Sequence, residues 1–114
     1  MGKDVNIILD DILNAICEIE SFFETREKRY EIYTSDICLK RAIERNITII
    51  GEAMNRLLRL STTINITAAR RIVDTRNYVI HGYDSVTDEI IWGIVVRHLP
   101  ILKQEVSRLL NISE

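Results

Sequence analysis

The chain has 114 residues, which is long enough for one hydrophobic core but too short for two. Hydrophobic residues make up 46% of it and charged residues 28%, a balance that is typical of folded globular proteins. One proline and four glycines are too few for the turns of an all-β protein, and no apolar run reaches the length of a membrane span. We therefore expect one helical domain over residues 1–114.

The first residues do not resemble an export signal, because acidic residues follow the initial methionine closely. We therefore expect a cytoplasmic protein without a membrane segment. Cys17 and Cys38 are isolated and lack metal-ligand spacing, so we expect both to be small core residues and expect no metal site.

Charge is distributed unevenly along the chain. Residues 1–25 contain one Lys and six Asp or Glu, for a net charge of −5. Residues 39–76 contain eight Lys or Arg and three Asp or Glu, for a net charge of +5. This asymmetry is consistent with an acidic face and a basic face, and it permits a nucleic-acid partner. Ordinary solvated helix surfaces explain it equally well.

The first half of the chain predicts two helices joined by a polar stretch. The first helix covers about residues 5–23, with an apolar stripe of Val5, Ile8, Leu9, Ile12, Ile16, Ile19 and Phe23. Residues 25–36 are expected to fray or turn, and Ser35 or Asp36 to cap the second helix, which ends near Leu60. Its apolar stripe is Leu39, Ile43, Ile47, Ile50, Met54 and Leu57. Gly51 in its interior costs roughly 1 kcal/mol relative to Ala, so we expect another helix to approach closely there.

The second half predicts two further helical segments. Thr67 is expected to cap a third helix over residues 68–81, and Gly82 to end it. A fourth segment is expected to start near Ser85 or Thr87, with an apolar stripe of Ile91, Ile94, Val95, Leu99, Leu102, Val106 and Leu109. Pro100 must kink or split this segment. Four or five helices with short connections predict an antiparallel bundle.

Residues 76–83, RNYVIHGY, gather three polar side chains where the third helix is expected to end. On an ideal helix Arg76 and His81 lie about 140° apart, although the last residue of a helix can turn away from this path. The planar fork of Arg76 suits a phosphate, and His81 suits proton transfer. Histidine and arginine without clustered carboxylates indicate metal-free cleavage of RNA, which needs a base, an acid and a cation.

This reaction is best served by two proton-transfer groups, whereas one chain offers one histidine in this segment. A two-fold symmetric homodimer would place two copies of Arg76 and of His81 in one cleft. On chemistry alone a second interpretation stays open: His81 only caps the helix, Arg76 pairs with Asp74 or Glu52, and Tyr83 packs in the core.

Residues 76–83 match the R-x4-H-x-Y motif of HepT-type toxins in the HEPN superfamily, and Asn77 fits the polar residue that commonly follows the motif arginine. The segment LKRAIERNITIIGEAMNRL, residues 39–57, resembles the second-helix segment of this family. The segment IIWGIVVRHLPILKQEV, residues 90–106, resembles its C-terminal segment. The resemblance covers nearly the whole chain.

The resemblance implies an all-α homodimer of HEPN type that acts as a metal-independent endoribonuclease on RNA such as tRNA or mRNA, without a cofactor. It implies catalytic roles for Arg76 and His81 and a supporting role for Asn77. It also implies that the protein is the toxin of a type VII-like toxin–antitoxin pair. The implied partner is a minimal nucleotidyltransferase antitoxin, which transfers AMP from ATP to Tyr83.

Two other functions stay open. The chain is alternatively a non-catalytic helical subunit that binds a nucleotidyltransferase and presents its nucleotide or RNA substrate, or a dimeric scaffold. Outside the motif, His98 is expected at the surface or at a helix end, with a contact to RNA as the alternative. Glu52 is expected on a solvated face or in a salt bridge, with orientation of a site arginine as the alternative.

Overall fold

The computed structural model describes residues 2–81 and 85–113. The helices are α1 (Lys3–Ser21), α2 (Tyr30–Ser35), α3 (Ile37–Leu60), α4 (Ala69–His81), α5 (Ser85–Gly93), a π-helical turn (Ile94–His98) and α6 (Leu99–Ser113). No residue in these two ranges lies in a β-strand, so the predicted all-helical class is confirmed. None of the helices described is both long and apolar enough to cross a membrane. Gly82, the expected C-cap of α4, lies outside the described residues.

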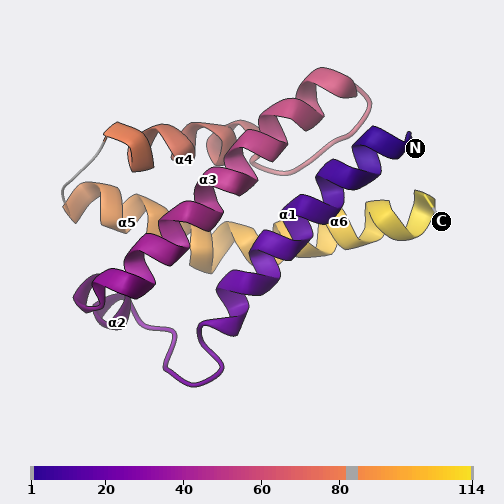
Figure 1. Ribbon diagram of the computed structural model, residues 1–114. Helices are drawn as coiled ribbons and strands as arrows, with labels where there is room; N and C mark the ends of the chain where they lie inside the picture. The colour runs from indigo at the N-terminus through magenta and orange to yellow at the C-terminus, as the bar shows by residue number, and fades with distance from the viewer. Residues whose placement is uncertain (1, 82–84, 114) are drawn as a thin grey trace.

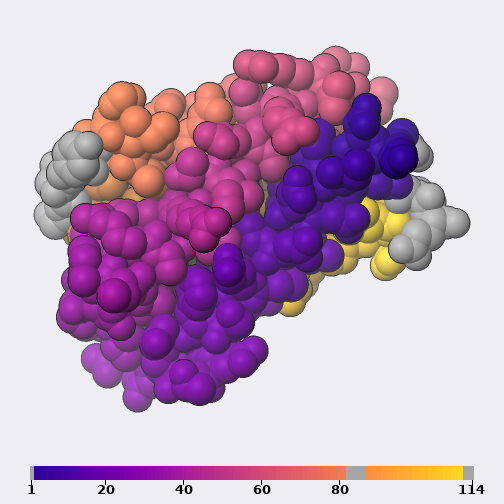
Figure 2. All heavy atoms as spheres, in the orientation of Figure 1, coloured from indigo at the N-terminus to yellow at the C-terminus, as the bar shows by residue number. Residues whose placement is uncertain are grey.

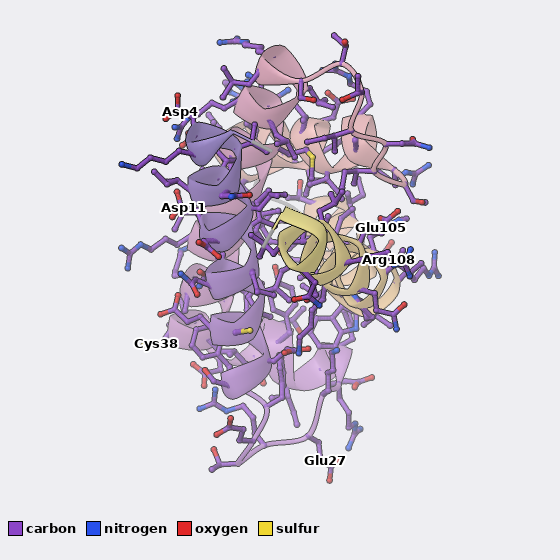
Figure 3. All side chains as sticks on the ribbon, turned by 90° about the vertical axis from the view of Figure 1, so that its right-hand side faces the viewer. Asp4, Asp11, Glu27, Cys38, Glu105 and Arg108 are labelled. Atoms are coloured by element: carbon purple, nitrogen blue, oxygen red, sulfur yellow. The ribbon has the colours of Figure 1, made fainter. Side chains whose placement is uncertain are left out.

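Helices α1 and α3 pack side by side and run in opposite directions (Figure 1). Helix α4 packs on α3 and α5, and α6 packs on α1. The acid-rich and arginine-rich segments are therefore neighbours, and Asp4 of α1 shares a surface groove with Arg56 and Arg59 of α3. Figure 2 shows α1 and α3 together on one face of the molecule, and Figure 3 shows Asp4 and Asp11 pointing outward from α1. The two kinds of charge thus lie on adjacent helices.

One hydrophobic core fills the space between the helices. The predicted stripes supply these buried residues: Ile8, Leu9, Ile12, Ile16, Ile19, Leu39, Ile43, Ile47, Ile50, Met54, Leu57, Ile91, Ile94, Val95, Leu99, Leu102 and Val106. Cys17 and Cys38 are exposed, so the prediction that they belong to the core is wrong. Each stands one position from a core residue, about 100° around its helix, and so lies off the buried stripe.

The polar stretch that was expected to fray or turn contains α2, and Tyr33 of this short helix is fully buried. The Tyr33 ring stacks on Trp92 of α5, with ring centroids 5.3 Å apart, and Phe23 packs edge-on against the same indole. Six residues are too few for a helix that is stable by itself. Packing of Tyr33 against Trp92 of α5 therefore stabilises α2, which its polar sequence did not predict.

The two predicted N-caps have different outcomes. Asp36 caps α3 as expected, because its Oδ1 accepts a hydrogen bond from the Leu39 N–H at 3.1 Å. Thr67 does not cap α4, so that prediction is wrong. Its backbone N–H and its hydroxyl both donate to the carboxylate of Glu105 in α6, and Ala68 precedes the helix with a φ of 59°. Figure 3 shows Glu105 on α6.

The chain stays helical through Pro100, where a kink or a split was expected. The hydrogen-bond pattern changes instead, because the N–H of Leu99 donates to the carbonyl oxygen of Ile94, five residues earlier. Ile91, Val95 and Leu99 are all buried and four positions apart. Two such steps drift by about 80° on an ideal α-helix, and the wider π-helical turn keeps these residues on the core side.

Candidate functional site

Arg76 lies where α4 crosses α3. A Cβ added to Gly51 would be 3.1 Å from the Cβ of Arg76 and 3.3 Å from the carbonyl oxygen of Ile72. These distances are shorter than ordinary van der Waals contacts, so the missing side chain of glycine lets the two helices meet. The predicted close approach at Gly51 is confirmed, and it fixes the backbone of α4 at Arg76.

The side chain of Arg76 is partly buried. Within the described ranges it makes no ion pair, either with Asp74 or with Glu52, the two partners considered from the sequence. Both of these carboxylates are on exposed residues, which agrees with the solvated position expected for Glu52. The five N–H donors of the Arg76 guanidinium thus have no carboxylate among the described residues to neutralise them, and they suit a phosphate.

His81 is the last residue of α4 and is exposed. Because it still belongs to the helix, it stays about 140° around the axis from Arg76 and about 7.5 Å along it. His81 shares its helix face with Asp74 and Tyr78, which precede it by two turns and one turn. A single copy of the chain therefore does not bring Arg76 and His81 together on one face of α4.

Asn77 and Tyr83 are the other two residues predicted to belong to the site. Asn77 is exposed beside Arg76 on α4. Tyr83 lies outside the described residues, so its role stays a prediction. Across residues 2–81 and 85–113, no three His, Cys, Asp or Glu side chains gather in a way that could hold a metal ion.

A cavity of about 680 Å³ lies between α4, α5 and the π-helical turn, and we name it the α4–α5 cavity. Its lining comprises Arg71, Asp74, Thr75, Tyr78, Glu89, Ile90, Gly93, Ile94, Arg97 and His98. His98 is half-buried at the end of the π-helical turn, which agrees with the expected helix-end position. Burial lowers the pKa of His98, and the positive charges of Arg71 and Arg97 lower it further.

A family model described as ribonuclease HepT-like matches residues 12–109. A Thermococcus cleftensis protein named "Probable ribonuclease HepT" is 34% identical over 105 residues, which cover 89% of this chain and 91% of that protein. A Methanocaldococcus jannaschii protein named "Putative RNase MJ0127" is 28% identical over 110 residues, covering 96% of this chain and 89% of that protein.

Another Methanocaldococcus jannaschii protein, named "Gamma-glutamylcyclotransferase and putative RNase MJ0434", is 31% identical over 112 residues. These residues cover 97% of this chain and 50% of that protein, so the chain spans half the length of this relative. No solved structure matches the chain. The family match confirms both the predicted resemblance and the predicted enzyme class: the chain belongs to the ribonuclease HepT-like family.

Proposed function

We propose that this ribonuclease cleaves RNA internally and without a metal ion, with Arg76 and His81 as its catalytic residues. The observation that carries the proposal is the state of these two side chains on α4. Arg76 is held at the crossing with α3 and has no carboxylate partner in the described part of the chain. His81 is exposed at the end of the same helix, where RNA can reach it.

The chemistry assigns a task to each residue. The ribose 2′-oxygen attacks the adjacent phosphorus, and the bond from phosphorus to the 5′-oxygen of the next nucleotide breaks. One group accepts the 2′-hydroxyl proton and another protonates the leaving 5′-oxygen, which leaves a 2′,3′-cyclic phosphate and a 5′-hydroxyl. His81 suits proton transfer near neutral pH, and Arg76 suits the added negative charge on the phosphorane. Asn77 supports the site by hydrogen bonding to the RNA.

The same geometry supports the proposal of a homodimer. One copy holds Arg76 and His81 about 140° apart on α4 and offers one histidine in the motif. A two-fold axis beside the end of α4 would bring two copies of each residue into one cleft. Ile80, directly before His81, is 48% exposed and adds apolar surface for such a contact.

Cleavage of total RNA and tRNA in excess EDTA tests the catalytic assignment. We expect the unmodified protein to cut, and the folded His81→Ala and Arg76→Ala variants to be at least about 100-fold slower. Arg108→Ala is the matched control, because Arg108 is exposed on α6 (Figure 3) and should not affect cleavage. Cleavage that persists in both motif variants, or that needs an added metal ion, would contradict the assignment. A wild-type protein with unmodified Tyr83 that does not cut would favour the non-catalytic binding subunit.

The proposal extends to regulation: the protein is the toxin of a type VII-like toxin–antitoxin pair, and a minimal nucleotidyltransferase neutralises it by AMP transfer to Tyr83. The Tyr83 oxygen attacks the α-phosphorus of ATP, the phenolic proton is released, and pyrophosphate leaves. The added phosphate lies two residues from His81 in the sequence. Its negative charge would oppose the binding of an RNA phosphate there.

Intact-mass measurement tests the modification. Incubation with ATP and a nucleotidyltransferase of the proposed antitoxin class should raise the mass by one or more AMP units, and Tyr83→Phe should abolish the increase. Tyr78→Phe is the matched control, because Tyr78 is an exposed tyrosine on α4 that lies outside the predicted modification position. An unchanged wild-type mass beside a demonstrably active nucleotidyltransferase would contradict the proposal.

A further inference from the structure

The α4–α5 cavity is placed to continue the path of an RNA strand away from His81. Its volume of about 680 Å³ lies within the range of roughly 300–1,000 Å³ that is usual for small-ligand sites. Asp74 and Tyr78 in its wall share a face of α4 with His81, which follows Tyr78 by three residues and roughly 4.5 Å. A nucleotide that adjoins a phosphate bound at His81 is therefore close to the cavity.

The arginines of the cavity suit a phosphodiester. Arg71 comes from α4 and Arg97 from the π-helical turn, and both are exposed. Both lie near enough to His98 to affect its protonation, so the two cations stand close to the same end of the cavity. Neither guanidinium group forms an ion pair or a hydrogen bond with another described residue. Their donors are available to phosphate oxygens.

Other side chains of the cavity suit a nucleobase. Tyr78 is 44% exposed, and a tyrosine ring of this kind can stack on a base. Asp74 and Glu89 are exposed carboxylates that contribute to its lining from α4 and α5. Ionised carboxylates only accept hydrogen bonds, so they match the exocyclic amino group of a base such as cytosine, whereas uracil has no amino group and offers only its N3–H. These carboxylates would also repel a phosphate, which indicates that the cavity accommodates a base as well as a phosphate.

Gly93 borders the open space of the cavity. A Cβ added to Gly93 would meet no atom within 4 Å, whereas one added to Gly51 would press against α4. A glycine inside a helix costs roughly 1 kcal/mol relative to alanine. Close packing explains that cost at Gly51, and an open binding space explains it at Gly93.

We propose that the α4–α5 cavity binds one unpaired nucleotide of the RNA substrate beside the cleaved phosphate and prefers bases with an exocyclic amino group. Arg71 and Arg97 bind the phosphate of this nucleotide, Tyr78 stacks on its base, and Asp74 and Glu89 accept hydrogen bonds from the amino group. The inference rests on the proposed ribonuclease function, since it assigns a substrate contact to the same enzyme.

Equilibrium binding of RNA tests the cavity separately from cleavage. The His81→Ala protein is titrated in EDTA against short fluorescein-labelled oligo(C) and oligo(U), and fluorescence anisotropy reports the affinity. Gly93→Leu places a leucine side chain in the cavity and is a better helix former, and it should bind oligo(C) about tenfold more weakly. Arg97→Gln should weaken both oligonucleotides and reduce the slope of log K against log salt by about 0.7.

The base preference has its own variant. Glu89→Gln replaces a carboxylate by an amide that also donates, so it should narrow the preference for oligo(C) over oligo(U) by roughly fivefold. Glu24→Gln and Arg108→Gln are the matched controls for a lost negative and a lost positive charge, because both residues are exposed and lie outside the cavity lining. Both should bind RNA as the His81→Ala parent does.

Each outcome decides the proposal. Parent-like affinity of both Gly93→Leu and Arg97→Gln overturns it, even if the wild-type protein cuts RNA in EDTA. The expected losses support it, even if the wild-type protein cuts nothing, so the two proposals fail separately. Light scattering provides a third arm: a Gly93→Leu protein that changes its molecular mass but keeps its RNA affinity would assign the cavity to a contact between copies and overturn RNA binding there.

Discussion

Arg76 and His81 belong to one helix, yet at the residue scale their surroundings differ. Arg76 is partly buried and its Cβ borders the space that Gly51 leaves open in α3, whereas His81 is exposed at the helix end. A charge that must stay in one place benefits from this support. A proton-transfer group instead needs access to the substrate. The division fits the tasks proposed for the two residues.

The protonation of His98 offers a test at the same scale. Burial and the charges of Arg71 and Arg97 lower its pKa, so the folded chain binds a proton there less readily than the unfolded chain. The free energy of unfolding should therefore fall as the pH drops below 6.5 and through the lower folded-state pKa. His98→Gln should remove part of this fall. Urea unfolding of both proteins from about pH 8 to about pH 5 measures it.

The carboxylates of Asp74 and Glu89 also line the cavity, but the shift of the His98 pKa comes from burial and from the two arginines. Arg71→Gln, with His98 unchanged, is the control. It removes one positive charge, so it should raise the pKa of His98 and reduce the acid-induced loss of stability. Superimposable pH profiles for the wild type and His98→Gln would contradict the expected effect.

Single residues also show what the sequence could predict. The spacing of Arg76 and His81 is visible in the sequence, so both were candidates before the fold was known. Arg71 and Arg97 were missed as possible substrate contacts, because they are distant in the sequence and only the packing of α4 in the fold brings Arg71 to Arg97 and His98. A helical pattern reports which residues share one helix face, but not which faces meet.

At the element scale, the crossing of α3 and α4 positions Arg76. Gly51→Ala would place a Cβ 3.1 Å from the Cβ of Arg76, so we expect α4 to shift by a few tenths of an ångström. The rate of RNA cleavage should fall roughly tenfold, since catalysis is sensitive to such displacements. The free energy of unfolding should change by less than about 1 kcal/mol, because alanine offsets the strain by its better helix propensity. Cleavage kinetics and urea unfolding measure the two effects.

Gln104→Ala provides the comparison for that experiment, because Gln104 is exposed on α6 and the substitution should leave cleavage unchanged. A folded Gly51→Ala protein that cuts RNA at the wild-type rate would show that the crossing does not determine the position of Arg76.

Helices with their own cap and stripe were predicted well, and those that depend on distant partners were not. Helix α3 has both, since Asp36 caps it and its apolar residues recur at helical spacing. Helix α2 depends on the contact between Tyr33 and Trp92, and the start of α4 depends on Glu105 of α6. Both partners come from segments much later in the sequence, so local signals did not reveal them.

At the scale of the whole molecule, the proposed homodimer makes a prediction about mixed variants. Arg76→Ala and His81→Ala dimers should each be inactive, but a heterodimer of the two retains one Arg76 and one His81. If both copies contribute to one cleft, subunit exchange should give a mixture that cuts RNA faster than either variant alone. Cleavage in EDTA after mixing measures this, and light scattering measures the molecular mass.

The same experiment can fail in two informative ways. A mixture no faster than its components, despite demonstrated subunit exchange, would show that one Arg76 and one His81 from different copies do not suffice for cleavage. A strictly monomeric wild-type protein with full activity would rule out the dimeric site.

The all-helical class followed from scarce glycine and proline and from apolar stripes at helical spacing. The arrangement of the helices could not be predicted, because an apolar stripe does not show which other helix it packs against. Packing of α1 on α3 places the acid-rich segment beside the arginine-rich one, where the sequence suggested separate faces. The α4–α5 cavity likewise exists only once α4 lies against α5.

The π-helical turn makes this part of the chain tolerant to the loss of one residue. Val96 within the turn is 44% exposed, so the core loses little with its side chain. The turn closes its hydrogen bond over five residues, one more than an α-helix, so deleting Val96 would let it close into an α-helix. The residues after it would keep their face, and Leu102 and Val106 would stay in the core that α6 shares with α1. Homologous chains should therefore lack one residue here far more readily than they carry an additional one.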